Sequence, residues 1–187
     1  MGRRVEADET MSADDMIPTW VDGVLQPFEK LEAHRRGLRH KAVSVFVNCG
    51  HRTLLQRRAL GKYHTPGLWA NACCTHPHWG EDTADCAARR LGEELNLSGL
   101  RPRFAGHVHY RADVGGGLTE DEEVDIFIVE LDHLIDVSPN PAEVMDTKWV
   151  ATEDAAADVR AAPTRYTPWL RIYFERHRDL FDRRSEG

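Results

Sequence analysis

A narrow apolar stripe along residues 83–95 limits the fold classes that this chain can adopt. Apolar side chains recur at positions i, i+3, i+4, i+7 and i+11, a spacing that places on one face of an α-helix the residues Ala84, Ala87, Ala88, Leu91 and Leu95. Asp82 or Thr83 is a suitable N-cap. Because alanine forms much of the stripe, the helix can lie close to a flat partner, which favours a helix packed on a β-sheet.

Segments on both sides of this helix have the composition of strands. The run AVSVFV at residues 42–47, the turn residues 48–50 and the run TLLQRR predict a hairpin over residues 42–58. We expect further strands at residues 69–75, 103–112, 122–131 and 147–150. Because helical and extended segments alternate along one chain, the sequence predicts an α/β fold, a mixed β-sheet flanked by helices.

The two ends of the chain differ in character. Thr167 and Pro168 have the residue types of an N-cap and a first turn, and they precede a helix whose apolar face is Trp169, Ile172, Tyr173, Leu180 and Phe181. Residues 1–16 are polar and acidic without an apolar period, which predicts a flexible acidic N-terminal tail. We therefore expect a single domain over residues 17–187, with Trp20, Trp79 and Trp149 in its core.

The charge balance restricts the partners. The chain carries 24 Lys and Arg against 31 Asp and Glu, a formal net charge of −7. Nucleic acids and anionic membranes attract basic surfaces, so neither is expected as a partner. No run approaches the ~20 apolar residues of a membrane span. A small-molecule partner is the remaining expectation, and the sequence is compatible with a monomer without fixing the oligomeric state.

The cysteines and glycines bear on the compartment and on redox chemistry. Four cysteines are present without a C-x-x-C pair, which fits a reducing, cytoplasmic compartment. The G-x-G-x-x-G fingerprint of dinucleotide binding is absent, so we expect no redox cofactor. Ten histidines are dispersed along the chain, which suggests a use for imidazole.

Side-chain alternation predicts which polar groups share a face. Cys74 and His76 lie two residues apart on an expected strand and can point into one cavity. The same argument applies to Glu120 and Glu122, which continue into an apolar face, or alternatively to Asp121 and Glu123. Imidazoles with carboxylates form a mixed nitrogen and oxygen set that suits Zn²⁺ or Mn²⁺, and six-coordination favours Mn²⁺.

The segment from Thr75 to Leu97 resembles a degenerate Nudix box. The positions that match this strand-loop-helix signature are Glu81, Arg89, Leu91, Glu93, Glu94 and Leu97. Thr75 and Asn96 replace two glycines of the box, and Arg90 replaces its first core glutamate. The loss of that carboxylate puts diphosphate hydrolysis, the usual activity of Nudix enzymes, in doubt.

Several blocks in order resemble the type 1 isopentenyl-diphosphate delta-isomerase family. Between Lys30 and Trp169 these blocks are KLEAH, RRALGKYHTPGLWANACCTHP, HYRAD, TEDEE and TPWL. The resemblance implies a single-domain Nudix-like fold. It also implies an isomerase of isoprenoid precursor biosynthesis that interconverts isopentenyl and dimethylallyl diphosphate. A proton is added to one alkene carbon and another is removed from the opposite face, an antarafacial transfer.

The same resemblance implies two metal sites. The family's Mn²⁺ or Zn²⁺ ligands correspond to His34, His40, His76, Glu120 and Glu122. A Mg²⁺ ion that arrives with the substrate diphosphate would be held by Glu94 and by the backbone carbonyl of Cys74.

Residues for proton transfer and for substrate binding can also be assigned. The resemblance implies that Cys74 and Glu122 carry protons, that Tyr110 is hydrogen-bonded to Glu122, and that Trp169 covers the cationic carbon. The cations placed to bind the diphosphate are Lys30, Arg58, Lys62 and Arg90. The other histidines receive no role, although His109 could line the rim of the pocket; they are His51, His64, His78, His107, His109, His133 and His177.

Two alternatives remain at this point. A Nudix diphosphate hydrolase would require Glu93 and Glu94 and would not need Cys74. A non-catalytic module of the same fold would bind metal without turnover.

Overall fold

The computed structural model describes residues 15–182, in which nine strands form one mixed sheet. The strands are β1 (Met16–Val21), β2 (Val24–Glu29), β3 (Arg39–Cys49), β4 (Arg52–Arg58), β5 (Trp69–Asn71), β6 (Cys73–Thr75), β7 (Arg103–Gly115), β8 (Leu118–Glu130) and β9 (Val144–Ala151). The helices are α1 (Lys30–Arg36), α2 (Thr83–Leu95), α3 (Thr152–Ala161) and α4 (Pro168–Arg176), with short 3₁₀ turns η2 (Pro163–Arg165) and η3 (Arg178–Leu180). The predicted α/β class with a mixed sheet is confirmed.

Strand β3 organises the sheet because it pairs with neighbours on both edges. It runs parallel to β8 from Arg39 opposite Asp121 to Asn48 opposite Glu130. It is antiparallel to β6, where Ser44 lies opposite Cys74, and it forms the predicted hairpin with β4. Thus β6 and β8, which carry most of the candidate site residues, take their positions from one strand.

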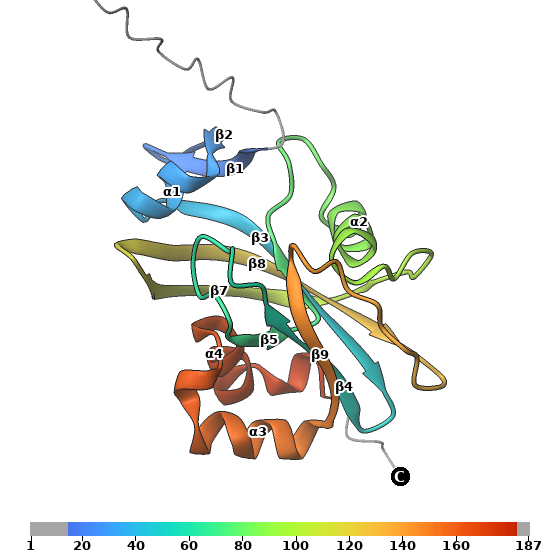
Figure 1. The fold of residues 1–187 in the computed structure, drawn as a ribbon. Coiled ribbons are helices and arrows are strands. Elements are labelled where there is room, and N and C mark those ends of the chain that lie inside the picture. Colours follow the sequence, from blue (N-terminus) through green and yellow to red (C-terminus); the bar gives the residue numbers. More distant parts are fainter. Residues whose placement is uncertain (1–14, 183–187) are drawn as a thin grey trace, which may run out of the picture.

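Helices cover both faces of the sheet (Figure 1). On one face α2 buries its stripe against the odd-numbered side chains of β3, in a cluster that includes Val43, Val45, Val47, Leu91 and Leu95. On the other face α3 and α4 close a second cluster around Phe46, Ile126, Trp169 and Tyr173. The even-numbered face of β3, which begins at His40, therefore points toward α4.

Helix α2 has the predicted bounds and the predicted N-cap, since the Asp82 side chain accepts a hydrogen bond from the Ala84 amide. The buried face of α2 is rotated about the helix axis relative to the predicted apolar stripe. Cys86 and Glu94 are buried, whereas Ala84 is only half-buried. As a result Glu94 lies inside the protein.

Three expectations were wrong in detail, and some elements were missed. The strand at residues 69–75 is two strands, because Asn71 donates hydrogen bonds to the carbonyl groups of both Val45 and Cys73 at the break. Strands β1 and β2 and helices α1 and α3 were not predicted. Helix α4 ends at Arg176, so the expected helical face continues only as the η3 turn. Trp79 is 48% exposed, because it follows β6 in a surface loop.

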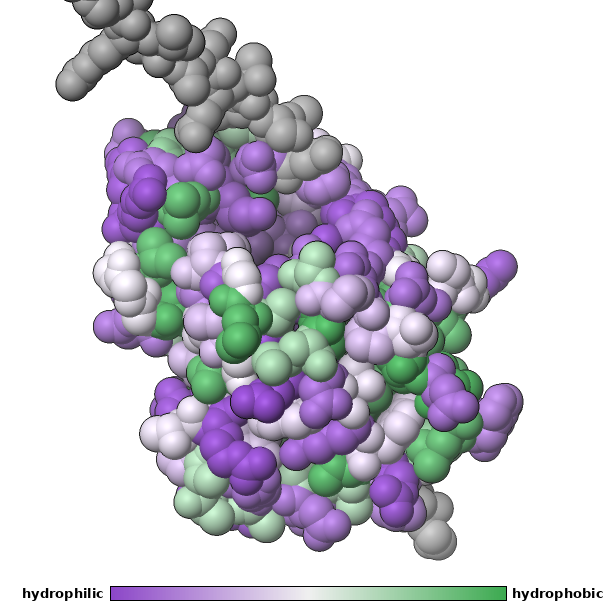
Figure 2. Space-filling view, in the orientation of Figure 1, coloured by the Kyte–Doolittle hydropathy of each residue, from purple (hydrophilic) through white to green (hydrophobic). Residues whose placement is uncertain are grey.

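The outer limits of the domain are partly defined. Residues 1–14 of the predicted tail lie outside the described residues, and β1 already begins at Met16. No helix within residues 15–182 is long and apolar enough to cross a membrane. Hydrophilic residues cover much of the face seen in Figure 2, and the hydrophobic patches between them are small and separate.

Candidate active site

A tight connection between α1 and β3 brings two histidines together. Helix α1 ends at Arg36 and is capped by Gly37, whose φ of 58° lies in the left-handed region. A Cβ at Gly37 would approach a guanidinium nitrogen of Arg111 to 2.9 Å. Glycine is therefore the residue that this turn requires. The chain reverses into β3, and the imidazole centroids of His34 and His40 lie 4.6 Å apart.

Two further residues complete the cluster. His76 follows β6, and its Nε2 lies 2.9 Å from Oε1 of Glu122 on β8. Glu122 pairs with His40 across β3 and β8, so that Nε2 of His40 lies 3.5 Å from the same oxygen. One ligand atom from each of the four residues His34, His40, His76 and Glu122 lies within 4.8 Å of the others. This spacing suits ligands of one ion.

The hydrogen bonds of the imidazoles leave nitrogens free for a metal. Nδ1 of His34 lies 2.6 Å from the Lys30 carbonyl, and Nδ1 of His40 lies 2.7 Å from the Leu38 carbonyl. A carbonyl oxygen only accepts, so each Nδ1 carries the hydrogen and each Nε2 presents a lone pair. Both Nε2 atoms are buried and have no hydrogen-bond partner among the described residues. The residues therefore fit a divalent cation.

Two buried carboxylates lie beside this cluster. The Tyr110 hydroxyl donates to Oε2 of Glu120 at 2.8 Å or to Oε2 of Glu122 at 2.5 Å. Burial and the neighbouring charge of Glu122 raise the pKa of Glu120. Burial alone would also raise the pKa of Glu122, but the hydrogen bond from the His76 imidazole holds it well below its ordinary value. Two carboxylates this close favour a cation between them.

His64 belongs to the site although no role was predicted for it. It lies in the loop between β4 and β5, is 6% exposed, and places Nε2 3.4 Å from Oε1 of Glu120. With His34 and Glu120 it forms a second group of potential ligands. Burial and Arg58 lower the pKa of His64 to about 2, so its imidazole is neutral. The neighbouring Thr65 has a φ of 46°, which lies in the left-handed region that a β-branched residue rarely adopts.

Cys74 points to the same face of the sheet. Its Sγ lies 2.7 Å from the Ser44 hydroxyl and 3.3 Å from Oδ1 of Asn71. Burial raises the pKa of the Cys74 thiol well above its ordinary value, although the Ser44 contact partly offsets this. Cys74, Glu122 and Trp169 line one pocket of about 60 Å³. The structure thus brings the sulfur and the carboxylate together in a narrow space.

Trp169 forms the wall of this pocket from α4. The side chain is 1% exposed, and its indole N–H has no hydrogen-bond partner among the described residues. The Arg58 guanidinium lies 5.3 Å from the ring centroid, and His64 packs edge-on against the ring. The ring is therefore held by contacts from the β4 end and the following loop.

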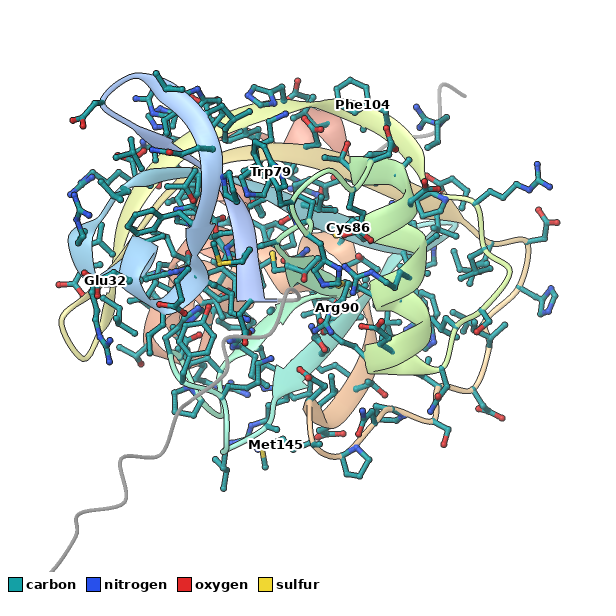
Figure 3. The ribbon with its side chains drawn as sticks, turned by 90° about the horizontal axis from the view of Figure 1, so that it is seen from above. Glu32, Trp79, Cys86, Arg90, Phe104 and Met145 are labelled. Atoms are coloured by element: carbon teal, nitrogen blue, oxygen red, sulfur yellow. The ribbon has the colours of Figure 1, made fainter. Side chains whose placement is uncertain are left out.

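The four predicted diphosphate ligands lie on different elements and line this pocket together, namely Lys30, Arg58, Lys62 and Arg90. Figure 3 shows Arg90 projecting from α2 toward the centre of the molecule. Burial and the surrounding cations lower the pKa of Lys30, while Asp15 partly offsets them. An anion is the ligand that such a set of cations would stabilise.

Glu94 lies under Arg90 on the α2 face of the sheet. Its carboxylate accepts hydrogen bonds from Arg90 at 2.6 Å, from Gln56 at 3.0 Å and from the Cys73 thiol at 3.6 Å. Two of the other Nudix-box residues pair with each other, since Arg89 donates to Glu81 at 2.6 Å and 2.8 Å. The structure places Glu94 close to the cations, and its contact with the β6 segment is through Cys73 rather than the Cys74 side chain.

Side chains alternate between the two faces of β7 and β8, and those on the outer face lie outside the site. Asp121 contacts His109 and Arg111, and Glu123 contacts Arg39. The alternative ligand pair Asp121 and Glu123 therefore faces away from the cluster. His109 was wrongly expected at the pocket rim, because it precedes Tyr110 and points to the opposite face.

Comparison with known proteins first defines the class. Residues 38–170 match the NUDIX domain. Among solved structures, a Nudix hydrolase from M. smegmatis has a TM-score of 0.58 at 18% identity, covering 89% of this chain and 94% of that chain. A MutT NUDIX hydrolase from Burkholderia pseudomallei has a TM-score of 0.57 at 19% identity, covering 73% of this chain and 96% of that chain. These similarities show the NUDIX fold.

Comparison of sequences then defines the family. A protein of Rhodobacter capsulatus is 59% identical over 168 residues, which are 90% of this chain and 96% of that protein. A protein of Dinoroseobacter shibae is 61% identical over 163 residues, which are 87% and 93% of the two chains. Both are named isopentenyl-diphosphate Delta-isomerase. The chain belongs to the isopentenyl-diphosphate Delta-isomerase family.

Proposed function

We propose that this protein interconverts isopentenyl diphosphate and dimethylallyl diphosphate by an antarafacial proton transfer. The observation that carries the proposal is the shared pocket, which is lined by Cys74, by the buried carboxylate of Glu122 and by Trp169. The reaction needs this combination because an alkene is a very weak base. Its protonation requires a positioned acid, a base on the other side and protection of the cation from water.

Cys74 and Glu122 are the proposed proton carriers. One adds a proton to an alkene carbon, and the other removes a proton from the opposite face of the substrate. Asn71 and Ser44 orient the Cys74 thiol, and the Tyr110 hydroxyl orients Glu122. Substrate carbon atoms between the two groups would satisfy the requirement for transfer on opposite faces.

The proposed Mn²⁺ or Zn²⁺ ligands are His34, His40, His76, Glu120 and Glu122, and the free Nε2 atoms of His34 and His40 support this set. A divalent ion there supplies a fixed positive charge that orients the Glu122 carboxylate and makes a proton on it more acidic. We add His64 as a neighbour of Glu120 that restricts the position of its carboxylate.

The proposed diphosphate ligands are Lys30, Arg58, Lys62 and Arg90, which surround the mouth of the pocket. Glu94 and the backbone carbonyl of Cys74 are proposed to hold Mg²⁺ that enters with the substrate, because Mg²⁺ prefers oxygen ligands and bridges phosphate oxygens. Trp169 is proposed to stabilise positive charge on the substrate through its ring face. Free thiols at all four cysteines agree with a cytoplasmic reaction.

A deuterium experiment tests the proposal. The protein is incubated with Mg²⁺, Mn²⁺ and isopentenyl diphosphate in deuterated water, and the substrate is followed by proton NMR. We expect deuterium in dimethylallyl diphosphate without release of phosphate. Release of phosphate without deuterium incorporation would instead identify a hydrolase, and metal binding without either reaction would identify a non-catalytic module.

Variants of two cysteines assign the role of the thiol. Cys74→Ala should lower kcat by about 10²–10⁴-fold, the usual cost of removing a proton carrier. Its bound metal should stay unchanged. Cys49→Ala is the matched control, because Cys49 lies at the end of β3 outside this pocket. Near-normal turnover by Cys74→Ala would exclude the assigned role.

A further inference from the structure

Glu143 is a half-buried carboxylate beside the cations of the candidate site. It directly precedes β9, and its Oε2 lies 2.5 Å from Nζ of Lys62 and 3.6 Å from a guanidinium nitrogen of Arg90. Lys30, Lys62, Arg90 and Glu143 line a cavity of about 270 Å³ next to the pocket that contains Cys74. Glu143 therefore contacts two of the four cations proposed to bind the diphosphate.

The backbone of Glu143 is fixed independently of these ion pairs. Its carbonyl accepts a hydrogen bond from the Ala59 amide at 2.9 Å, and its amide donates to the Asn140 carbonyl at 3.0 Å. The Asn140 amide donates in turn to the Glu94 carbonyl on α2 at 2.9 Å. The carboxylate can thus move away from Lys62 while the turn that carries it stays in place.

Lys62 and Arg90 depend on Glu143 to different degrees. Within residues 15–182, Glu143 is the only carboxylate that pairs with Lys62. Arg90 pairs with Glu93 at 2.7 Å and with Glu94 at 2.6 Å as well. An anion that binds Lys62 must therefore compete with the Glu143 carboxylate, whereas Arg90 keeps two other partners.

We propose that Glu143 is a displaceable counter-ion, which neutralises Lys62 when no diphosphate is bound and yields this position to a phosphate oxygen of the substrate. This inference rests on the proposed diphosphate site. A diphosphate carries more charge than one carboxylate and can contact several cations at once, so it is the stronger ligand. The repulsion between the two anions is then a cost of binding that Glu143 imposes.

The opposite role, a permanent anchor for Lys62, predicts the opposite effect of removing the charge. Glu143→Gln separates the two, because glutamine keeps the length of the side chain and a carbonyl oxygen that accepts from Lys62. If Glu143 competes with the substrate, its neutralisation tightens anion binding. If it only anchors Lys62, the variant binds the anion with equal or lower affinity.

The test measures binding of pyrophosphate with Mg²⁺ by titration calorimetry. We expect Glu143→Gln to bind about tenfold more tightly than the natural protein in low salt, and we expect the difference to shrink at high ionic strength because salt screens the repulsion. KM for isopentenyl diphosphate should fall in the same direction. Glu143→Asp, which keeps the charge on a shorter side chain, should tighten binding less than Glu143→Gln.

Glu93→Gln is the matched control. Glu93 also pairs with Arg90 and lines the same cavity, but its side chain is 45% exposed and does not contact Lys62. We expect less than a twofold change. Equal or weaker pyrophosphate binding by Glu143→Gln, or an equal gain in Glu93→Gln, would overturn the inference. Absence of pyrophosphate binding by the natural protein would instead refute the proposed diphosphate site.

Discussion

The orientation of a few side chains is decided by backbone groups rather than by other side chains. The carbonyls of Lys30 and Leu38 fix the imidazoles of His34 and His40. Asn71 combines two roles, since its amide nitrogen holds the break between β5 and β6 while its oxygen contacts the Cys74 sulfur. Rotamers fixed in this way need little reorganisation when the site is used.

Substitutions of Trp169 test whether its aromatic face contributes to turnover. A cation over an aromatic face in a dry site gains about 2 kcal/mol, which corresponds to roughly thirtyfold in rate. We expect Trp169→Phe to retain clearly more kcat than Trp169→Ala, measured with isopentenyl diphosphate. Thermal melts of both variants control for stability, because the side chain is 1% exposed. Equal losses of kcat would indicate that Trp169 acts through packing alone.

At the scale of elements, strands β7 and β8 divide their polar residues between two faces. Tyr110, Glu120 and Glu122 point inward to the site, and the intervening residues form ion pairs on the outer face. There His107 places Nδ1 2.9 Å from Asp125 and Nε2 2.6 Å from Glu123. Arg39 also contacts Glu123, and Lys41 lines the same surface pocket. The hairpin is thus stabilised outside by interactions that the site does not use.

The His107 contacts predict a pH dependence of stability. Burial opposes protonation, but the hydrogen bonds and charges of Asp125 and Glu123 together outweigh it and raise the pKa of His107 above its ordinary value. Its contribution is therefore present below about pH 6.5, the unfolded value, and is lost as the pH rises through the folded-state pKa. Because the side chain is 51% exposed, we expect a loss below about 1 kcal/mol.

Thermal melts at two pH values measure this loss. His107→Gln should melt below the natural protein at pH 5.5 and together with it at pH 9. The exposed His133 offers a control, and His133→Gln should not change the difference between the two pH values. A deficit of His107→Gln that is the same at both pH values would contradict the assignment to the charged pair.

At the scale of the whole molecule, the histidine and glutamate cluster joins parts of the chain that are far apart. His34 lies on α1, His40 on β3, His76 after β6 and Glu122 on β8. An ion held by all four would bind the folded chain and not the unfolded one. Binding of this kind stabilises the folded state by about 2.7 kcal/mol when the free ion is at 100 times its Kd.

Removal of metal should therefore lower the melting temperature. After treatment with a chelator, return of Mn²⁺ or Zn²⁺ should raise the melting temperature by about 5–10 °C, since each kcal/mol corresponds to about 2–4 °C in a chain of this size. His76→Ala should lose most of this gain and bind less metal, as measured by elemental analysis. A full gain in His76→Ala would show that the ion binds elsewhere.

Much of the fold was accessible from the sequence because the decisive patterns are local. The stripe on residues 83–95 gave both ends of α2, and the alternation after Glu120 selected the inward face of β8. Helix α3 was missed because two of its four buried residues are alanines, and α1 because it has only seven residues. Neither provides a strong apolar period.

The site was less accessible where loops supply its residues. His64 contacts Glu120 from a loop in which the next residue, Thr65, adopts a positive φ, and local propensity argues against that conformation in threonine. Glu143 lies 81 residues after Lys62, and their contact depends on the pairing of β4 with β9. Contacts of this kind follow from tertiary packing and leave no local signal.

The position of β3 between β6 and β8 restricts insertions and deletions within this strand. Ser44 lies opposite Cys74 on one edge and opposite Ile126 on the other, and His40 lies opposite Glu122. A single inserted or deleted residue within β3 would turn one end of this face outward and separate the sulfur from the carboxylate. Divergence among relatives should therefore change the lengths of surface loops and leave the length of this strand untouched.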